Sequence, residues 1–293
     1  MLSLHTNAAA LSTTSAVSNT QRALSASLTR LGTGYRINSA MDDAAGLQIS
    51  TRLEAQSRGM AVAQRNTQNG ISMMQTAEGA FDEVTNILMR MKDLATESAT
   101  ASASTEDRAA MQAEYDSLGA EIGNIIKNTT FGGANLFSDG STTNGASGKL
   151  SAAMTFQIGS DKGETMEVNV SAKLTALATK LTGLSTNYGT SVGNSEINTL
   201  SAANGKIEAI GSALDDVGGL RSALGAASNR LDHVYNNLSN MSTNTAAAKS
   251  RITDVDFASE TATMTSKQLL LQAGTSMLKQ SSSMSQLALS LLN

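Results

Sequence analysis

The chain of 293 residues contains no proline, no cysteine and no tryptophan, and it has only 4 tyrosines and 5 phenylalanines. Without cysteine it forms no disulfide and offers neither a thiolate metal site nor a thiol nucleophile. Proline is the residue that most strongly interrupts a helix, so its absence permits long continuous helices. Because large aromatic side chains are scarce, small and unbranched side chains must fill the interior, which favours helices that pack closely along narrow seams.

Charge and hydropathy exclude further classes of protein. The formal net charge is −4, so the chain lacks the basic surface that nucleic-acid binding requires. No apolar run reaches about 18 residues, the length that spans a membrane. A cleaved signal peptide begins with basic residues that precede an apolar core. The first lysine or arginine here is Arg22, so we do not expect the N-terminal segment to be a signal peptide. The two histidines, His5 and His233, lie near opposite ends of the sequence, so we predict no histidine-based site and no cofactor.

Apolar residues recur every seven positions near both ends of the chain. This spacing places them along one broad side of a helix. We call the following set the terminal stripe: Leu4, Leu11, Val17, Leu24, Leu31, Phe257, Met264, Leu270, Leu271, Met277, Leu278, Met284 and Leu291. When two such helices of one copy pack together, each covers one face of the other and leaves its remaining apolar side chains in water. Burying each of those side chains would contribute roughly 1.5–3 kcal/mol of stabilisation. The pattern therefore favours packing among many copies, as in a helical filament, over an ordinary intramolecular coiled coil.

Three further segments, at about residues 74–95, 111–125 and 210–248, show the same heptad spacing. Five helical seams in one chain favour a coiled-coil bundle over a layered α/β domain. Apolar and polar residues then alternate in two short runs on either side of residues 159–163, and this alternation predicts a β-hairpin.

We therefore expect a mostly α fold, a long antiparallel coiled-coil helical bundle with a small β-hairpin region. The two terminal helices are predicted to form a discontinuous domain of residues 1–43 with 254–293. Residues 44–253 are predicted to form a core helical domain, with the hairpin at about 150–171 and a surface connection at about 172–203.

Polar residues of possible chemical interest cluster just after the N-terminal helix. Asp42 and Asp43 are adjacent carboxylates, and Arg36 precedes them. General acid and base catalysis requires an enclosing pocket and a partner, which nothing in the sequence indicates, so we interpret these residues as a polar turn with ion pairs and caps. The Gly32-Thr33-Gly34 stretch fits neither dinucleotide-binding nor phosphate-loop spacing and is interpreted as a flexible joint, since two glycines close together allow bending.

Several long stretches resemble bacterial flagellins. RLGTGYRINSAMDDAAGLQIS at residues 30–50 is similar to the N-terminal signature of that family. QRNTQNGISMMQTAEGAFDEV at residues 64–84 and the C-terminal segments ITDVDFASE, LLLQAGTSMLKQ and LSLLN are similar to flagellin as well. The resemblance covers about residues 1–140 and 200–293. The segment at 172–203 is too short for a further domain, so the chain resembles a minimal flagellin without large outer domains.

The resemblance implies a non-enzymatic structural subunit that self-assembles into the bacterial flagellar filament for swimming motility. The terminal helices would form an inner-tube coiled coil in that filament. Subunits would be exported unfolded by the flagellar type III system and would reside outside the cell. The implied partners are other copies of the chain, an export chaperone on the C-terminal helix, the filament cap and the hook-junction proteins. Neither nucleic acid nor membrane is among them.

Innate immune receptors are further implied partners. Arg90, Leu94 and Glu114 match positions at which flagellins contact the animal Toll-like flagellin receptor. Leu94 lies off the main apolar stripe of its segment, so we expect it to be partly exposed. Residues 30–50, which include Arg36, Asp42 and Asp43, match the segment that plant flagellin receptors bind.

Three alternatives to the flagellin interpretation differ in class. A hook–filament junction protein would share the terminal heptads, although the long match at both ends disfavours it. An enzyme would show a preformed apolar pocket with convergent polar groups. A needle-type secretion protein is usually much smaller.

Overall fold

The computed structural model describes residues 7–138, 143, 147–188 and 195–290, with the backbone alone at 284–290. The helices of this part are α1 (Ala8–Thr33), α2 (Ala44–Ser98), α3 (Thr105–Asn128), α4 (Ser171–Leu184), α5 (Leu200–Thr253) and α6 (Phe257–Ser290), with short 3-10 turns η1 (Lys149–Ser151) and η2 (Thr186–Tyr188). Its strands are β1 (Thr130–Phe131), β2 (Ala134–Asn135), β3 (Met154–Gln157) and β4 (Thr165–Val168). The predicted mostly α fold with a small β region is confirmed.

The chain divides into two compact units, residues 1–57 with 243–293 and residues 58–242. This division falls within α2 and α5, whereas the sequence suggested one at the helix ends, after residue 43 and before residue 254. The difference has a local cause, because the start of α2 and the end of α5 belong to the packing of the first unit. Lys249 of α5, for example, donates a hydrogen bond of 2.6 Å to Glu54 of α2.

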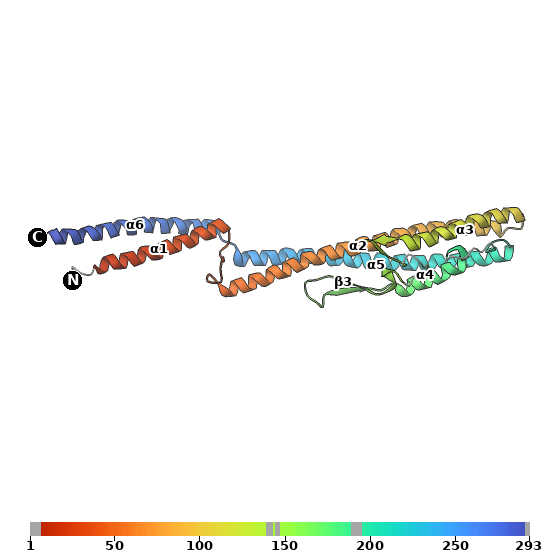
Figure 1. Cartoon of the computed structure of the whole chain (residues 1–293), viewed down its shortest axis with the longest axis horizontal. Helices are drawn as coiled ribbons and strands as arrows, with labels where there is room; N and C mark the ends of the chain where they lie inside the picture. Colours follow the sequence, from red (N-terminus) through yellow and green to blue (C-terminus); the bar gives the residue numbers. More distant parts are fainter. Residues whose placement is uncertain (1–6, 139–142, 144–146, 189–194, 291–293) are drawn as a thin grey trace. The chain divides into compact units, whose positions relative to one another are not determined.

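In the first unit, α1 and α6 pack side by side and run antiparallel (Figure 1). Asn7 caps the start of α1 by accepting a hydrogen bond from the Ala10 amide, and its own amide group reaches the Ser281 hydroxyl at 3.2 Å. Further along, a Cβ atom placed on Gly274 of α6 would lie 2.7 Å from Val17 of α1. The two helices therefore approach closely because the residues between them are small.

Two segments of the first unit, residues 34–43 and 254–256, connect these helices to α2 and α5, and we call them together the joint. Gly34 ends α1 with φ of 78°, a left-handed conformation that glycine adopts without strain. The segments pair as short antiparallel backbone: the Arg36 amide donates to the Thr253 carbonyl at 2.6 Å and the Val255 amide to the Gly34 carbonyl at 3.0 Å. The flexible joint expected at Gly32-Thr33-Gly34 is therefore wrong for Gly32 and Thr33, which belong to α1, and the crossing that begins at Gly34 is held by backbone hydrogen bonds.

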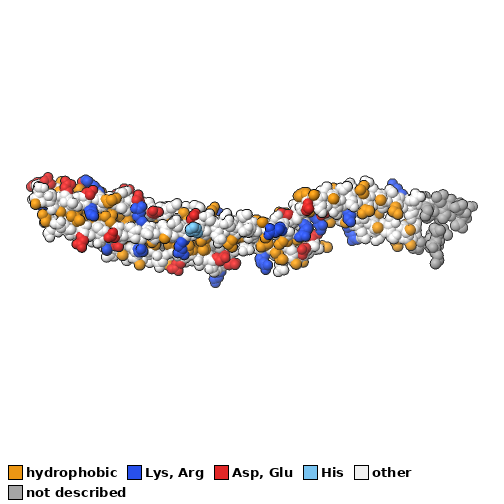
Figure 2. All heavy atoms as spheres, turned by 180° about the vertical axis from the view of Figure 1, so that it is seen from behind, with side chains coloured by type: hydrophobic (Ala, Val, Ile, Leu, Met, Phe, Trp, Pro, Cys, Tyr) orange, Lys and Arg blue, Asp and Glu red, His pale blue; other side chains and the backbone are white. Residues whose placement is uncertain are grey.

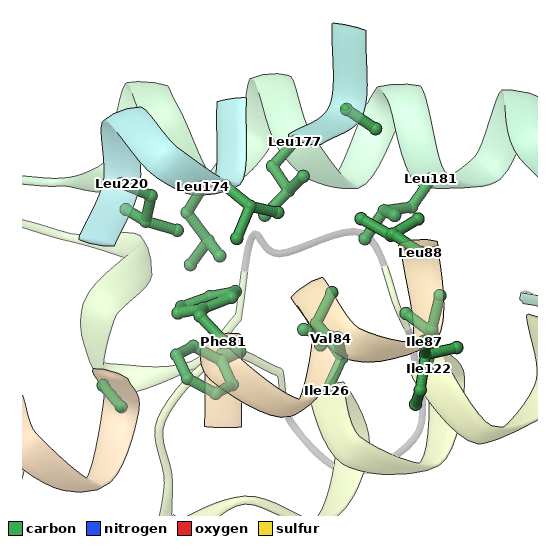
Figure 3. Close-up of a cluster of buried hydrophobic side chains, with 14 of the residues drawn as sticks. Phe81, Val84, Ile87, Leu88, Ile122, Ile126, Leu174, Leu177, Leu181 and Leu220 are labelled. Atoms are coloured by element: carbon green, nitrogen blue, oxygen red, sulfur yellow. The ribbon is translucent and has the colours of Figure 1, made fainter. Parts of the chain in front are cut away.

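The second unit has a core to which α2, α3, α4 and α5 all contribute. Figure 3 shows leucines of α4 and α5 facing apolar side chains of α2 and α3 across this core. The buried side chains that it labels are Phe81, Val84, Ile87, Leu88, Ile122, Ile126, Leu174, Leu177, Leu181 and Leu220. An aromatic pair lies here, with the ring centroids of Phe81 and Phe137 4.6 Å apart.

The β3–β4 hairpin lies against α2. Met154 pairs with Val168 and Gln157 with Thr165, so the two strands form the antiparallel hairpin that the alternating pattern predicts. A Cβ atom on Gly70 of α2 would lie 3.0 Å from the Phe156 ring, so this ring packs closely on α2 because Gly70 has no side chain. The shorter β1–β2 pair turns through Gly132 and Gly133, both with positive φ, as a two-residue hairpin turn requires.

The segment at about 172–203 differs from the surface connection that its composition suggests. It contains α4, whose buried side chains are Leu174, Leu177, Ala178, Leu181 and Leu184. Beyond α4, Tyr188 and Ile197 are also buried. Polar residues within α4, such as Lys173, Thr175 and Thr179, lie on its exposed side, while its leucines repeat every three or four positions and enter the core.

Candidate assembly surface and receptor site

The terminal stripe divides into two rows in the structure. Six members are half-buried in the seam between α1 and α6: Val17, Leu24, Leu31, Met264, Leu271 and Leu278. These residues hold the two helices of one copy together. Leu4 and Leu291 lie outside the described residues, as does the side chain of Met284.

The remaining members of the terminal stripe point away from that seam. Leu11 is 68% exposed, Leu270 53% and Met277 66%, and Phe257 is exposed as well. Burial of a large aliphatic side chain lowers the free energy by roughly 1.5–3 kcal/mol relative to leaving it in water. The helix pair thus presents an apolar surface that a second molecule could cover.

Two exposed residues of this surface were missed in the sequence, Leu28 and Leu269. Leu269 begins a run of three leucines, and three consecutive apolar residues on a helix point in directions about 100° apart. The run therefore widens the apolar surface beyond a heptad row. Leu28 follows Leu24 by four positions, a spacing that also places it beside the stripe.

Shallow grooves with small side chains adjoin these exposed residues. The groove between the two helices is lined by Ser12, Thr13, Ala16, Val17, Thr20, Leu270, Ala273, Gly274 and Met277. Another runs along α6 and is lined by Ala258, Thr261, Ala262, Thr265, Ser266, Leu269, Leu270 and Ala273. In Figure 2, hydrophobic side chains on this pair alternate with uncharged polar ones and few charges. Small side chains between large ones allow another helix to approach closely.

On the second unit, Arg90 of α2 and Glu114 of α3 form an exposed ion pair. The Nε atom of Arg90 donates to Glu114 Oε1 at 2.8 Å, and its Nη2 atom lies 2.7 Å from the same oxygen. The hydrogen bond and the negative charge of Glu114 raise the pKa of Arg90 above its ordinary value. Met89 is exposed beside the pair. The structure thus brings together two of the three residues assigned to the animal receptor.

The expectation that Leu94 is partly exposed is wrong, because its side chain is only 2% exposed and belongs to the core. Ile87, seven positions earlier, is buried too. The two residues form a second buried row on α2, since this helix is covered on more than one side. A free surface contact through Leu94 is therefore incompatible with this packing, while Arg90 and Glu114 remain accessible.

The polar turn at residues 36–43 has the caps that the sequence predicts, and an ion pair joins its Asp42 to Arg30 of α1 at 3.7 Å. Arg36 donates to the Ile252 carbonyl at 2.7 Å. Asp42 accepts hydrogen bonds from the amides of Asn38 and Ser39, which lower the pKa of its carboxyl group. Asp43 accepts from the Gly46 amide at 2.8 Å and so caps the start of α2.

Exposed residues in this turn include Arg36, Asp42 and Asp43, together with Met41, which is 97% exposed. They are thus accessible in a single copy. Their match to the segment bound by plant receptors remains a prediction.

A buried polar cluster of the second unit was not predicted. Glu196, only 8% exposed, accepts hydrogen bonds from Gln112 of α3 at 2.7 Å and from the Thr186 hydroxyl at 2.7 Å. Gln112 in turn accepts from the Ile197 amide at 2.7 Å. Burial raises the pKa of Glu196, but its hydrogen bonds from Thr186 and Ser195 outweigh burial and hold the pKa below the ordinary value. The cluster fixes the segment after α4 onto α3.

Within the described part of the chain, no group of three or more histidine, cysteine, aspartate or glutamate side chains is arranged to hold a metal ion. None of the helices described is both long and apolar enough to span a membrane.

Comparisons with known proteins agree with these features. Residues 4–142 match the model of the bacterial flagellin N-terminal helical region, and residues 207–292 match that of the C-terminal helical region. Flagellin B of Vibrio anguillarum is 34% identical and flagellin B of Vibrio cholerae serotype O1 is 33% identical, each over 99% of both chains. The first alignment spans 383 positions, so at least 90 of them have no residue in this chain of 293.

Among solved structures, a putative flagellar hook-associated protein from Vibrio parahaemolyticus superimposes with a TM-score of 0.55 and 19% identity, covering 73% of this chain and 100% of that one. At this identity the likeness shows the fold alone. The full-length relatives at 33–34% identity are flagellins. The chain therefore belongs to the bacterial flagellin family, as its sequence motifs predict, and is a structural protein rather than an enzyme.

Proposed function

We propose that this chain is the subunit of a bacterial flagellar filament, which many copies build by self-association for swimming motility. The observation that carries this proposal is the exposed apolar surface of the α1–α6 pair in a chain that belongs to the flagellin family. A single copy leaves Leu11, Leu270 and Met277 in water, and burial of such side chains drives association.

In such a filament, residues 1–43 with 254–293 form the inner-tube coiled coil, and residues 44–253 form the layer around it. The seam between α1 and α6 keeps the pair together, while the exposed row of each pair packs onto neighbouring copies. A contact that repeats head to tail without closing generates a helical filament. Long helices bundled in this way resist bending. A filament that is rotated at its base must be stiff in this sense to produce thrust.

The proposed life cycle places the chain outside the cell, after export in unfolded form by the flagellar type III system. The absence of cysteine fits this route, because no disulfide has to form or break on the way. Before export, the apolar face of α6 needs a cover, which an export chaperone on the C-terminal helix would supply. Filament cap and hook-junction proteins would meet the two ends of the assembly.

Recognition by innate immune receptors is the second part of the proposal. The Arg90–Glu114 pair offers an exposed charged contact for the animal Toll-like flagellin receptor. Leu94 supports this surface from within the core. The exposed Arg36, Asp42 and Asp43 fit the segment at 30–50 that plant receptors would bind.

Polymerisation of the purified chain tests the filament function. We expect long filaments in electron micrographs after addition of filament seeds. The double variant Leu270→Asp with Met277→Asp should not polymerise, because it places two charges on the exposed apolar row. A matched variant, Gln268→Asp with Ser276→Asp, adds the same charge at exposed polar positions of α6 and should polymerise.

The outcomes separate the alternatives. Normal filaments from the Leu270 and Met277 variant would show that this row lies outside the contact between copies. Failure of the unsubstituted chain to form long filaments under seeding would favour a junction protein of the same fold.

A further inference from the structure

Arg30 occupies an unusual position at the end of α1, between two carboxylates that belong to different segments. Its Nη2 atom lies 3.7 Å from Asp42 of the joint, and its Nη1 atom lies 3.9 Å from Glu260 in the first turn of α6. All three residues belong to the first unit. The guanidinium group of Arg30 on α1 thus faces one carboxylate from the joint and one from α6.

Neither contact is short enough to be a hydrogen bond. The Nε atom of Arg30 and the Oε1 atom of Glu260 are both buried, and among the described residues neither has a hydrogen-bond partner. A guanidinium group donates strongly when two of its N–H groups face one carboxylate as a fork. In the observed position Arg30 forms such a pair with neither acid, although both are within reach of a rotamer change.

The two acids are held in place independently of Arg30. Asp42 is fixed by the amides of Asn38 and Ser39, at 3.1 and 3.0 Å. Glu260 lies in the first turn of α6, whose start Asp256 caps by accepting from the Ala258 amide at 3.0 Å, and its side chain is only 14% exposed. Because burial restricts the Glu260 side chain and backbone amides hold that of Asp42, the longer arginine side chain is the part that changes position.

We infer that Arg30 is a two-position clasp of the joint, closing either on Asp42 or on Glu260. Closed on Asp42, it ties the end of α1 to residues 34–43. Closed on Glu260, it ties α1 to α6 and leaves the connecting segment less restrained. The observed position lies between these two arrangements.

The inference rests on the proposed filament function and deepens it. A filament changes its helical shape when subunits can adopt two packings of similar energy. Because the clasp joins the stripe-bearing helices to the joint, its position selects how α1 and α6 leave that joint. Each position therefore corresponds to one local shape of the filament.

Three variants separate the positions. Glu260→Gln removes the negative charge that faces Arg30 from α6 and leaves Asp42 as its partner. Asp42→Asn leaves Glu260 as the partner and keeps a side-chain oxygen that accepts from the Asn38 and Ser39 amides. Arg30→Gln removes both pairs. Arg22→Gln is the matched control, because Arg22 is exposed on the same helix and donates only to the Asn19 side chain among the described residues.

Helical pitch, measured by electron microscopy of filaments at fixed salt and pH, is the readout. We expect Glu260→Gln and Asp42→Asn to shift the pitch in opposite directions, and Arg22→Gln to keep the parental pitch. Arg30→Gln should give filaments of mixed pitch. A variant that does not polymerise alone is measured in copolymers with the unsubstituted chain, where the pitch should shift with its fraction.

The parental pitch in all variants, or a shift in the same direction for both acids, would overturn the clasp and leave the filament function intact. If the unsubstituted chain forms no filaments, the proposed function fails instead. The clasp is then judged from the NMR resonance of the Arg30 Nε–H group. It requires two different positions in Glu260→Gln and Asp42→Asn, and one common position overturns it.

Discussion

The α1–α6 pair and the core of residues 58–242 carry the same heptad pattern but bury it to different extents. Leu224 and Leu231 of the core are buried, whereas Leu270 and Met277 of the terminal pair are largely exposed. The cause is the number of helices around each apolar stripe. Four helices surround the core, while a pair of helices can cover only one face of each partner. A heptad pattern therefore predicts which face of a helix is apolar but not which molecule covers it.

The largest expected effect tests the core side of this comparison. Phe81→Ala removes a fully buried ring that packs on Phe137, and such truncations cost about 3–5 kcal/mol of unfolding free energy. Thermal unfolding of the monomer, followed by circular dichroism, should show a clearly lower midpoint. Leu270→Ala, at an exposed position, should leave that midpoint nearly unchanged. Equal losses in both variants would mean that the terminal pair has its own core in a single copy.

The second prediction concerns the order of the ends. If other copies cover the terminal pair, its amides should exchange hydrogen fast in the monomer and slowly in the filament, by at least about a hundredfold. Residues 1–40 and 255–293 should show this change, and the amides of residues 74–95 should stay protected in both forms. Hydrogen exchange with mass spectrometry measures both regions in one experiment. Equal protection of the ends in monomer and filament would contradict folding on association.

The fold is predictable from the sequence wherever its determinants are local. Heptads and the absence of proline predict the long helices because these features act locally. Leu94 was expected to be partly exposed, because the burial of the row that it shares with Ile87 depends on helices from elsewhere in the chain. For the same reason α4 was interpreted as a connection. Its leucines become core residues only when α2 and α5 provide a surface for them.

Among the candidate sites, residues whose roles follow from neighbours in sequence were predicted well. Asp42 and Asp43 act on amides within four positions of themselves, so a turn with caps was foreseeable. Arg30 and Glu196 were not foreseeable, because their partners lie far away in the sequence or in a segment whose path was unknown. Glu196 binds Gln112, 84 positions away, and Arg30 meets Glu260 only after the chain returns.

We expect the polar cluster around Glu196 to contribute less to the stability of the core than Phe81 does. Glu196→Gln replaces an acceptor oxygen by a donor that faces other donors, so it should lower the unfolding free energy by about 1–3 kcal/mol. Glu208→Gln, at an exposed position of α5, should have little effect. Urea unfolding of both monomers at neutral pH measures the difference. An unchanged stability of the Glu196 variant would mean that the segment after α4 is held by its apolar residues alone.

The same residue sets a pH dependence. The pKa of Glu196 is lower in the folded chain than its ordinary value of 4.5, so its contribution is present above pH 4.5 and is lost as pH falls through the folded value. Burial raises the pKa of Asp116 above 3.8, so the folded chain takes up this proton more readily than the unfolded chain. Protonation of Asp116 therefore favours the folded state as pH falls and opposes the loss of stability at Glu196. Because Glu196 accepts more hydrogen bonds, we expect stability to fall below pH 4.5, less steeply in Glu196→Gln. Parallel pH profiles in both proteins would contradict this assignment.

The smallest expected effect concerns the exposed Arg90–Glu114 pair, a charged surface in contrast to the apolar surface of the terminal pair. The Arg90–Glu114 pair is exposed in a single copy, so receptor binding should use the monomer, and packing between copies should block it in the filament. Arg90→Ala should weaken binding to the animal receptor by about tenfold, as loss of a central arginine contact commonly does. Lys127→Ala, on α3, is the matched control. Leu94→Ala should instead act through core packing and lower the thermal midpoint. Surface-based binding measurements with monomer, filament and these variants decide, and unchanged affinity of Arg90→Ala would place the receptor contact elsewhere.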